Sequence, residues 1–446
     1  MRGKTTGLLF LIGLFSVTQI RIIGSIGISE IPIFLVAPFL FITNYRVLKH
    51  DGFLPVVWLS LFTCVANCIS SHLNHTPIVL AMKGFATPYS IFAVIVVLHR
   101  LLRDNLNGYK WLLVGFAFSL IVNVFVFQQS NELEAFSDGA TGSIAGMRIV
   151  EGSAIFWTSR IRPFIDAFIG GWYSQIPSYV SVVLMVAFFL FSAISTASGR
   201  SMAGATLGGA VLLLIGGKKR RHMQFIKHHF VFFIVCGVLV SVFLSIGYKL
   251  AAQSGVMGEK SREKYERQMQ ERNGILGILR GGRAEVFIGL TACLEKPIWG
   301  HGPWPLDTND YTKRYMERYA TQAEWENYIS FDQYLSMAGL TRYRMIPGHS
   351  HIISFWLNYG IVGLILWLYV LYLIIVYFRK YIDVVPQWFG YMSITTPLFL
   401  WSIFFSPYGF RVTAPLPICM ILFVRATAMG RIHLPLEMQI EASKYD

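Results

Sequence analysis

The sequence predicts an all-α integral membrane protein of about twelve transmembrane helices. Of its 446 residues, 54% are hydrophobic and only 14% are charged, whereas about a quarter of the residues of a soluble protein are charged. The apolar residues form runs near the roughly 20 residues that cross a bilayer as a helix. Because backbone groups in lipid must be hydrogen-bonded internally, and these runs are too long for barrel strands, we expect helices.

Eleven apolar runs are visible, and the first follows Met1–Lys4 without an A-x-A-like cleavage site. We therefore expect a retained first span there rather than a signal peptide. The runs cover about residues 6–22, 30–43, 54–70, 78–99, 111–128, 178–197, 201–216, 230–249, 351–378, 388–405 and 411–424.

Basic residues beside these runs predict the orientation of the chain, because cytoplasmic loops carry an excess of Lys and Arg. The flanking clusters are Arg2/Lys4, Arg46/Lys49, Arg100/Arg103/Lys110, Lys218–Arg221, Arg379/Lys380 and Arg425/Arg431. This distribution explains the net charge of +14 as a topological signal. It does not resemble a nucleic-acid groove with interleaved aromatic residues, so we expect no nucleic-acid partner.

One crossing is hidden in the hydropathy pattern. Five spans from a cytoplasmic N-terminus leave residues 129–150 outside, but counting back from Lys218–Arg221 puts residue 177 inside. The segment at residues 153–173 supplies the missing crossing, and it carries Arg160 and Arg162. Charged residues within a span usually face a cavity or a partner, so these arginines are predicted to line a cavity. The alternative is an interfacial helix, which would break the charge pattern at several loops.

With this crossing the chain has twelve spans and two cytoplasmic ends. Residues 1–249 form spans one to nine, residues 250–350 form a large extracytoplasmic loop, and residues 351–446 form spans ten to twelve with a tail. The loop is expected to be partly helical, because Glu259–Arg272 is a charged run at helical spacing with pairs such as Glu263–Arg267.

Three polar clusters are predicted at the outer face. Arg200 and Arg283 each lie beside glycine, and a histidine precedes span ten. A single such arginine has a simple explanation in snorkelling or contact with lipid phosphate. Two arginines and a histidine on one face favour a phosphate-binding site over these simple explanations. Guanidinium groups bind phosphate bidentately, and histidine exchanges protons near neutral pH. The clusters are Ser198–Ser201, Arg280–Arg283 continuing to Glu295–Pro303, and Gly348–His351. They suit a lipid-linked phosphate or diphosphate leaving group.

Other chemistries fit the sequence less well. On a helix His349 and His351 lie about 200° apart, so they share no face for a metal ion, and no H-x-E or C-x-x-C companion is present. His301, between two glycines, is more typical of a loop than of a catalyst. The chain has no P-loop, G-x-G-x-x-G after a strand or G-x-S-x-G elbow, so we expect no nucleotide cofactor.

These clusters resemble motifs of the O-antigen ligase and O-antigen polymerase superfamily of bacterial envelope glycosyltransferases. Ser198-Gly199-Arg200 resembles its S-R element with an inserted glycine, and Gly282-Arg283 followed by Pro297-Ile-Trp-Gly-His-Gly302 resembles its G-R and P-x-x-G-x-G elements. His349-Ser350 leading to Gly360 and Gly363 resembles its H-N-x-x-L and G-x-x-G segments, with serine for asparagine and Ile353 for leucine. The resemblance covers about residues 196–378.

The resemblance implies a bacterial inner-membrane enzyme that moves a glycan from undecaprenyl diphosphate to an acceptor hydroxyl at the periplasmic face. Arg200 and Arg283, with Arg280 in reserve, would hold the diphosphate, and His349 would act as general base. Arg160, Arg162 and His351 would extend the cavity. The anomeric centre would be inverted, and no metal or other cofactor would be required because arginines take that role.

Three functions remain open on the sequence. A ligase would use a lipid A core as acceptor, or a protein hydroxyl in related members. A polymerase would use another lipid-linked repeat unit of O-antigen or exopolysaccharide. The pattern slightly favours the ligase. A polysaccharide transporter or flippase is the third, but it would rarely need a hundred-residue outer loop, and the sequence shows no inverted repeat.

Overall fold

The computed structural model describes about half of the chain. The described residues are 2–16, 19–21, 25–109, 111–115, 118, 224–225, 227–229, 254, 284–320, 322–337, 345–348, 350–385, 388, 392, 396, 399–400, 402–404 and 415–433. The runs predicted to span the membrane at residues 111–128, 153–173, 178–197, 201–216, 230–249 and 388–405 lie wholly or mostly outside them.

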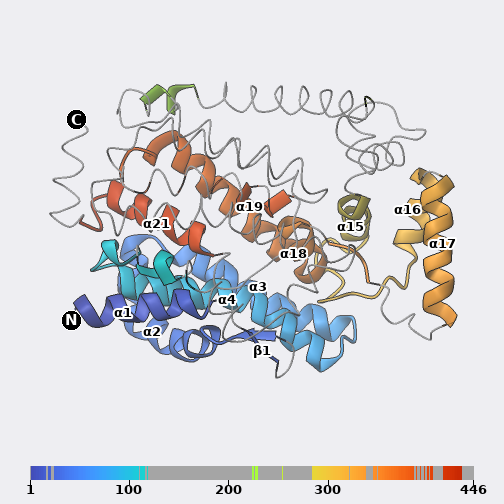
Figure 1. Cartoon of the computed structure of the whole chain (residues 1–446), viewed down its shortest axis with the longest axis horizontal. Helices are drawn as coiled ribbons and strands as arrows, with labels where there is room; N and C mark the ends of the chain where they lie inside the picture. The colour runs from blue at the N-terminus through green and yellow to red at the C-terminus, as the bar shows by residue number, and fades with distance from the viewer. Residues whose placement is uncertain are drawn as a thin grey trace.

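The described part is helical apart from one small hairpin, in which strand β1 (Gln19–Arg21) pairs antiparallel with β2 (Ser25–Gly27). Figure 1 shows the arrangement of the helices. In order they are α1 (Arg2–Leu14), α2 (Glu30–Asp51), α3 (Leu54–Leu73), α4 (Ile78–Leu102), the short η1 (Leu106–Gly108), α15 (Ala284–Glu295), α16 (Tyr311–Tyr319), α17 (Gln322–Met337), α18 (His351–Tyr359), α19 (Ile361–Val376), the π-helix η5 (Tyr377–Tyr381) and α21 (Leu416–Ala428).

Among the described residues, four helices are long and apolar enough to cross a membrane. They are α2, α3, α4 and the continuous helix Ile361–Tyr381 formed by α19 and η5. The all-α membrane class is therefore confirmed, while the total of twelve spans stays a prediction.

The first predicted span, residues 6–22, is divided in the structure. Helix α1 ends at Leu14, where the Ser16 hydroxyl donates to the carbonyl of Gly13 (2.7 Å), and β1 begins at Gln19. A helix of 13 residues rises only about 20 Å, short of the roughly 30 Å of hydrocarbon in a bilayer. The predicted span is too long because hydropathy does not distinguish the apolar helix from the isoleucine-rich hairpin that follows it. The β-branched isoleucines favour extended backbone.

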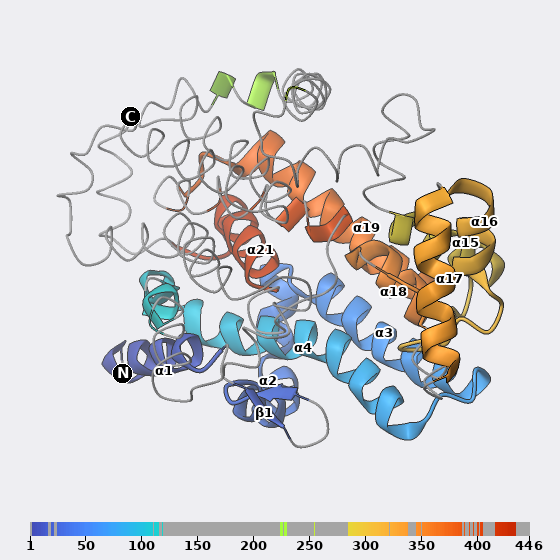
Figure 2. The ribbon, with the colours of Figure 1, turned by 45° about the vertical axis from the view of Figure 1, so that its right-hand side comes forward.

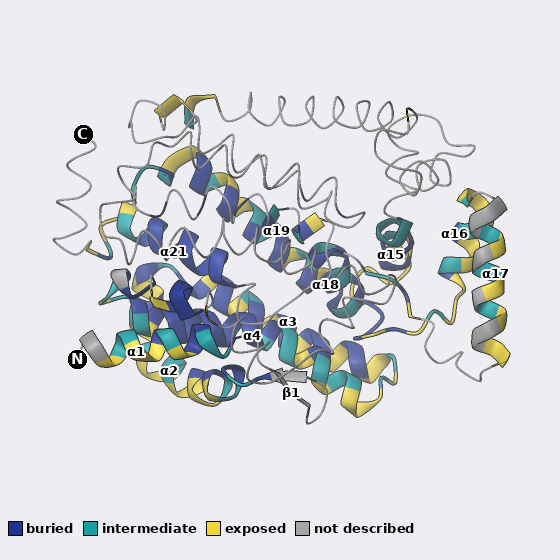
Figure 3. Ribbon diagram, viewed as in Figure 1, coloured by how far each residue is buried: buried dark blue, intermediate teal, exposed yellow. Residues whose placement is uncertain are grey.

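Helix α4 is the centre of the bundle. Every residue from Ile91 to His99 is buried, and α2, α3 and α21 pack around it (Figures 1 and 2). A helix that is apolar on all sides is expected to be buried in this way. Helix α2 instead turns Leu35, Phe39 and Ile42 outward, at the spacing of one helical face, as a lipid-facing helix would. Figure 3 shows this contrast between buried and exposed faces.

The predicted span at residues 351–378 is two helices in the structure. Helix α18 ends at Tyr359, and Gly360 has φ +66° before α19 begins at Ile361. A residue with this left-handed backbone cannot continue a right-handed helix. The candidate span is therefore Ile361–Tyr381, and α18 is a separate helix of nine residues.

The described end of the large loop is helical, as expected. Helix α15 packs on α18 and, with α16, forms a second small core distinct from that of the bundle. Its buried members are Ile288, Ala292, Cys293, Tyr311, Tyr315, Ile346, Ile353 and Leu357. Helix α17 follows α16 and runs across the direction of α19 (Figures 1 and 2).

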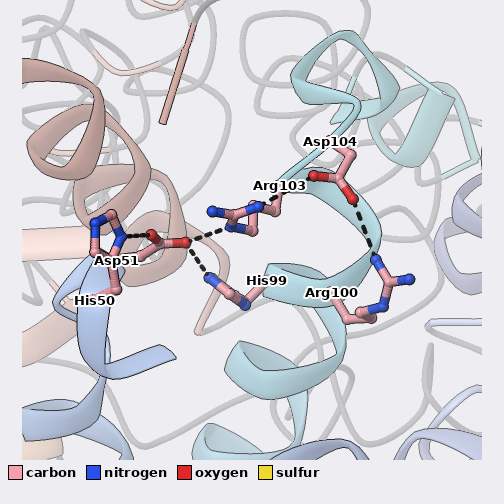
Figure 4. Close-up of polar contacts among 6 residues, drawn as sticks. All are labelled: His50, Asp51, His99, Arg100, Arg103 and Asp104. Atoms are coloured by element: carbon pink, nitrogen blue, oxygen red, sulfur yellow. Dashed lines mark hydrogen bonds and ion pairs between the residues drawn. The ribbon is translucent and has the colours of Figure 1, made fainter. Parts of the chain in front are cut away.

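A buried ionic cluster ties together the ends of α2 and α4 (Figure 4). The Asp51 carboxylate accepts a hydrogen bond from Arg103 Nε (2.7 Å) and lies 2.8 Å from His99 Nε2 and 2.8 Å from His50 Nδ1. The ring of His99 packs against Phe53 and Phe423, at centroid distances of 4.6 and 6.0 Å, which brings in α21. In the sequence, Arg103 serves only to predict the orientation of the chain. In the structure it also stabilises the fold by binding the Asp51 carboxylate.

We predict that Asp51→Asn lowers the free energy of unfolding by about 1.5–3 kcal/mol, because a neutral amide replaces a buried carboxylate that accepts a charge-assisted hydrogen bond from Arg103. Thermal unfolding of the purified protein in detergent measures the effect. The matched control is Asp104→Asn, whose exposed carboxylate pairs with Arg100 (3.3 Å) and with Arg103 (3.4 Å) and should matter by less than about 1 kcal/mol. Equal effects of the two substitutions would contradict a special role of Asp51.

Candidate functional site

The P-x-x-G-x-G element leaves α15 and lies against the break between α18 and α19. The backbone N–H of His301 donates to the Leu357 carbonyl (2.6 Å), and the N–H of Ile361 donates to the Ile298 carbonyl (3.1 Å). The indole N–H of Trp356 donates to the Pro297 carbonyl (3.0 Å). The segment Pro297–Pro303, here called the docking segment, thereby satisfies backbone groups at the end of one helix and the start of the next.

The docking segment also contacts the turn between α3 and α4. The Asn74 side chain donates to the Gly300 carbonyl (3.2 Å) and accepts from the Lys296 ammonium (2.8 Å). Pro303 lies directly over Gly84 of α4. Independently, the Tyr359 hydroxyl donates to the Gly84 carbonyl (2.8 Å). The loop, the α3–α4 hairpin and the α18–α19 break therefore meet at one place.

The glycines at this meeting point are required by backbone conformation and space. Gly300, Gly302 and Gly360 have φ of +69°, +82° and +66°. A Cβ on Gly360 would overlap the Ile298 carbonyl, and one on Gly300 would meet the Leu357 carbonyl. Glycine alone adopts these angles readily and leaves room for such close approach. The motif glycines thus have a structural role in docking the loop.

His301 is part of this joint rather than a surface loop residue. Its side chain is buried, and Nε2 lies 2.8 Å from the Ala292 carbonyl. Because a carbonyl oxygen only accepts, Nε2 carries the proton. Burial lowers the pKa of His301, against the opposing effect of the Ala292 hydrogen bond. A neutral His301 therefore links the end of α15 to α18, and the small residues on each side of it are the sequence signal for this close packing.

Helices α15 and α18 run in the same direction. Gly289 lies against Pro347 and Ile353, and further along the chain the Cys293 thiol lies 3.7 Å from the Ile353 carbonyl. The contacts of the docking segment continue this order, from Pro297 with Trp356 to Ile298 with Ile361. The first residues of the two helices, Ala284 and His351, therefore lie at the same end of the pair.

Most of the predicted site residues cannot be placed. Arg160, Arg162, Arg200, Arg280, Arg283 and His349 lie outside the described residues. His351 is described and buried, with its ring centroid 4.7 Å from that of Trp367 and 6.4 Å from that of Phe399. Its role as a cavity residue stays a prediction, as do the roles of the other six.

Ser350 occupies the position where the family motif has asparagine. Its hydroxyl accepts from the Ile353 N–H (3.2 Å), which caps α18, and donates to the Ile403 carbonyl (2.8 Å). Serine and asparagine are comparably good N-cap residues. The departure from the motif therefore keeps the start of α18 intact.

A second polar group joins the end of α15 to the start of α16. The Tyr311 hydroxyl donates to Glu295 (2.6 Å), Arg314 pairs with the same carboxylate (3.3 Å), and Asp307 accepts from the Tyr311 N–H (2.7 Å). Burial, helped by Glu295, raises the pKa of Tyr311 to about 12. Tyr311 therefore stays protonated at neutral pH and acts as a donor that holds the loop helices together.

The apolar spans and the loop docked on them define the class, an integral membrane protein with an ordered loop fixed to its helices. Over part of the chain, residues 182–368 match the family model described as O-Antigen ligase. The matched range contains all of the motifs on which the resemblance is based. Members of this family are membrane enzymes of the O-antigen ligase or polymerase type that use lipid-linked glycans. No curated protein and no solved structure matches the chain.

The matched range contains α15 to α18 and the first half of α19. It also contains Arg200, Arg280, Arg283, His349 and His351 in the sequence, whereas Arg160 and Arg162 lie before it.

We predict that Gly360→Ala undocks the loop, because the new methyl group would overlap the Ile298 carbonyl. Hydrogen exchange of residues 297–303 should rise, and the melting temperature should fall. The control is Gly430→Ala, where φ is +67° but nothing lies within 4 Å of the new Cβ. That change should cost only the backbone strain of about 1–2 kcal/mol and leave the docking segment protected. Unchanged exchange in Gly360→Ala would show that the contact is not needed.

Proposed function

We propose that this chain is a membrane glycosyltransferase that moves a glycan from undecaprenyl diphosphate to an acceptor hydroxyl at the periplasmic face, in the manner of an O-antigen ligase. The observation that carries the proposal is the parallel pair α15 and α18, which lies within the O-antigen ligase match. Arg283 directly precedes α15, and His349 lies between the described residues Gly348 and Ser350 at the start of α18.

Chain connectivity supports a common site for these two residues. Consecutive Cα atoms are about 3.8 Å apart, so a residue that adjoins a helix start stays near it. The two helices begin at the same end of the pair, and the positive ends of their dipoles favour an anion there. A diphosphate is such an anion, and an arginine binds it bidentately.

In the proposed reaction Arg200 and Arg283 hold the diphosphate of the donor, with Arg280 as a further ligand. His349 takes the proton of the acceptor hydroxyl as its oxygen bonds to the anomeric carbon of the glycan. The bond from that carbon to the diphosphate oxygen breaks, and its electron pair leaves with undecaprenyl diphosphate. The arginines stabilise the developing negative charge, and displacement from the opposite face inverts the anomeric centre. No metal is needed for this step.

The docking segment gives the proposed site its rigidity. It fixes the end of α15 to α18 through His301 and fixes both to the α3–α4 turn through Asn74. Transfer depends on keeping the leaving group and the base in register, since small displacements of reacting groups are costly. Arg160, Arg162 and His351 are proposed to line the adjoining cavity.

We predict that His349→Ala reduces glycan transfer about 100- to 10,000-fold, as expected for loss of a general base. Arg283→Ala should reduce it about 100- to 1,000-fold through lost stabilisation of the leaving group. Purified protein in liposomes with lipid-linked donor and acceptor provides the assay. The control variants are His433→Ala and Arg318→Ala, at exposed positions away from the proposed site. If both site variants transfer glycan at the rate of the controls, the assignment fails.

A deletion strain separates the two possible acceptors. We favour the ligase, and therefore predict bare lipid A cores on a glycolipid gel, with lipid-linked polymer still present. Cores that carry a single repeat unit would instead show a lost polymerase. That outcome would change the acceptor but leave the donor chemistry unaltered.

A further inference from the structure

The docking segment and the residues on either side of it carry an exposed apolar edge that the proposed transfer reaction does not use. Trp299 and Trp304 are 46% and 37% exposed although their backbones are held in place. The other large exposed apolar residues of this edge are Leu294, Ile298, Leu306 and Met345, of which the last two pair in an isolated β-bridge. We call this set the apolar edge. A fixed group of large apolar side chains facing outward indicates a binding surface.

The position of the apolar edge points to lipid. Pro303 packs on Gly84, six residues after the first residue of α4, or about 9 Å along the helix axis. Trp304 is the next residue after Pro303, so it lies close to α4, which is a candidate membrane-spanning helix. Around this end α4 exposes Ile78, Val79 and Met82, and α3 exposes Leu73. Figure 2 shows α18 alongside α3. The edge thus lies near exposed apolar side chains of α3 and α4.

The chemistry of the edge fits the boundary between headgroups and acyl chains. Tryptophan combines a large apolar ring with a polar N–H, and it gathers at membrane interfaces for this reason. Neither the Trp299 nor the Trp304 indole donates to another described residue, whereas the indole of Trp356 does. Lys296, exposed beside them, uses Asn74 as one acceptor, and an ammonium group has three donors. Its remaining donors suit a lipid phosphate.

We propose that the segment Lys296–Leu306 is an interfacial anchor, seated in the leaflet at the α3–α4 end with Trp299 and Trp304 at the acyl boundary. The anchor holds the loop at the height of the lipid headgroups. It rests on membrane insertion of α3 and α4 alone, so it stands whether or not the chain transfers glycans.

Depth-dependent fluorescence quenching tests the anchor. The full chain and its variants Trp299→Phe and Trp304→Phe are reconstituted in phosphatidylcholine–phosphatidylglycerol vesicles. The difference in emission between wild type and each variant isolates one tryptophan of the 11 in the chain. Phosphatidylcholine brominated near the top of its acyl chains should remove most of each difference emission. Phosphatidylcholine brominated near the chain ends should remove less, and aqueous iodide should have little effect.

The matched control is Trp325→Phe on α17, where the ring of Trp325 stacks on Tyr328 (5.7 Å) in the outlying part of the loop. Its difference emission should resist brominated lipid. The proposal is overturned if iodide but not brominated lipid quenches Trp299 and Trp304, because the rings would then face water, where they could stack on a sugar instead. Equal quenching of all three tryptophans by shallow bromine would also overturn it. Each ring is measured separately, so loss of one variant to misfolding leaves the other as a test.

Discussion

The close approach of backbone to backbone at Gly300 and Gly360 is the constraint on which the loop end of the molecule depends. A side chain would not fit at Gly300 or Gly360, so carbonyls and N–H groups meet directly, as in His301 with Leu357 and Ile361 with Ile298. These bonds satisfy the helix ends that Gly360 leaves open. They also fix α15 against α18, which sets the common end at which both helices begin. Without this contact the proposed site would have no rigid frame.

Hydropathy and charge predicted the class of the protein because they reflect the solvent around each helix. The runs at residues 54–70 and 78–99 correspond closely to α3 and α4. Hydropathy gave the wrong bounds for two spans, because backbone conformation determines where their helices end. Residues 6–22 join a helix to a hairpin, and residues 351–378 contain the break at Gly360, yet both ranges are predominantly apolar. A backbone break at a glycine changes the average hydropathy of such a range very little.

The candidate site was predicted from the order of the motifs, which all lie within the matched residues 182–368. The structure adds what the motifs could not convey. His301, read as an ordinary loop residue, is a buried cross-link, and the serine of His349-Ser350 keeps the cap that asparagine would provide. Asp51 escaped notice because a lone carboxylate at a helix end gives no sign of its partners 48 and 52 residues away.

The three-way contact of the docking segment also has a consequence for the order of assembly. Asn74 and Gly300 are 226 residues apart in the chain, and Gly84 and Tyr359 are 275 apart. Loop-closure entropy makes such distant pairs late to form. During synthesis the segment can meet the α3–α4 turn first, but its second partner exists only once α18 and α19 have followed. The joint therefore closes last, and an incompletely inserted chain would display the apolar edge without the frame that holds it.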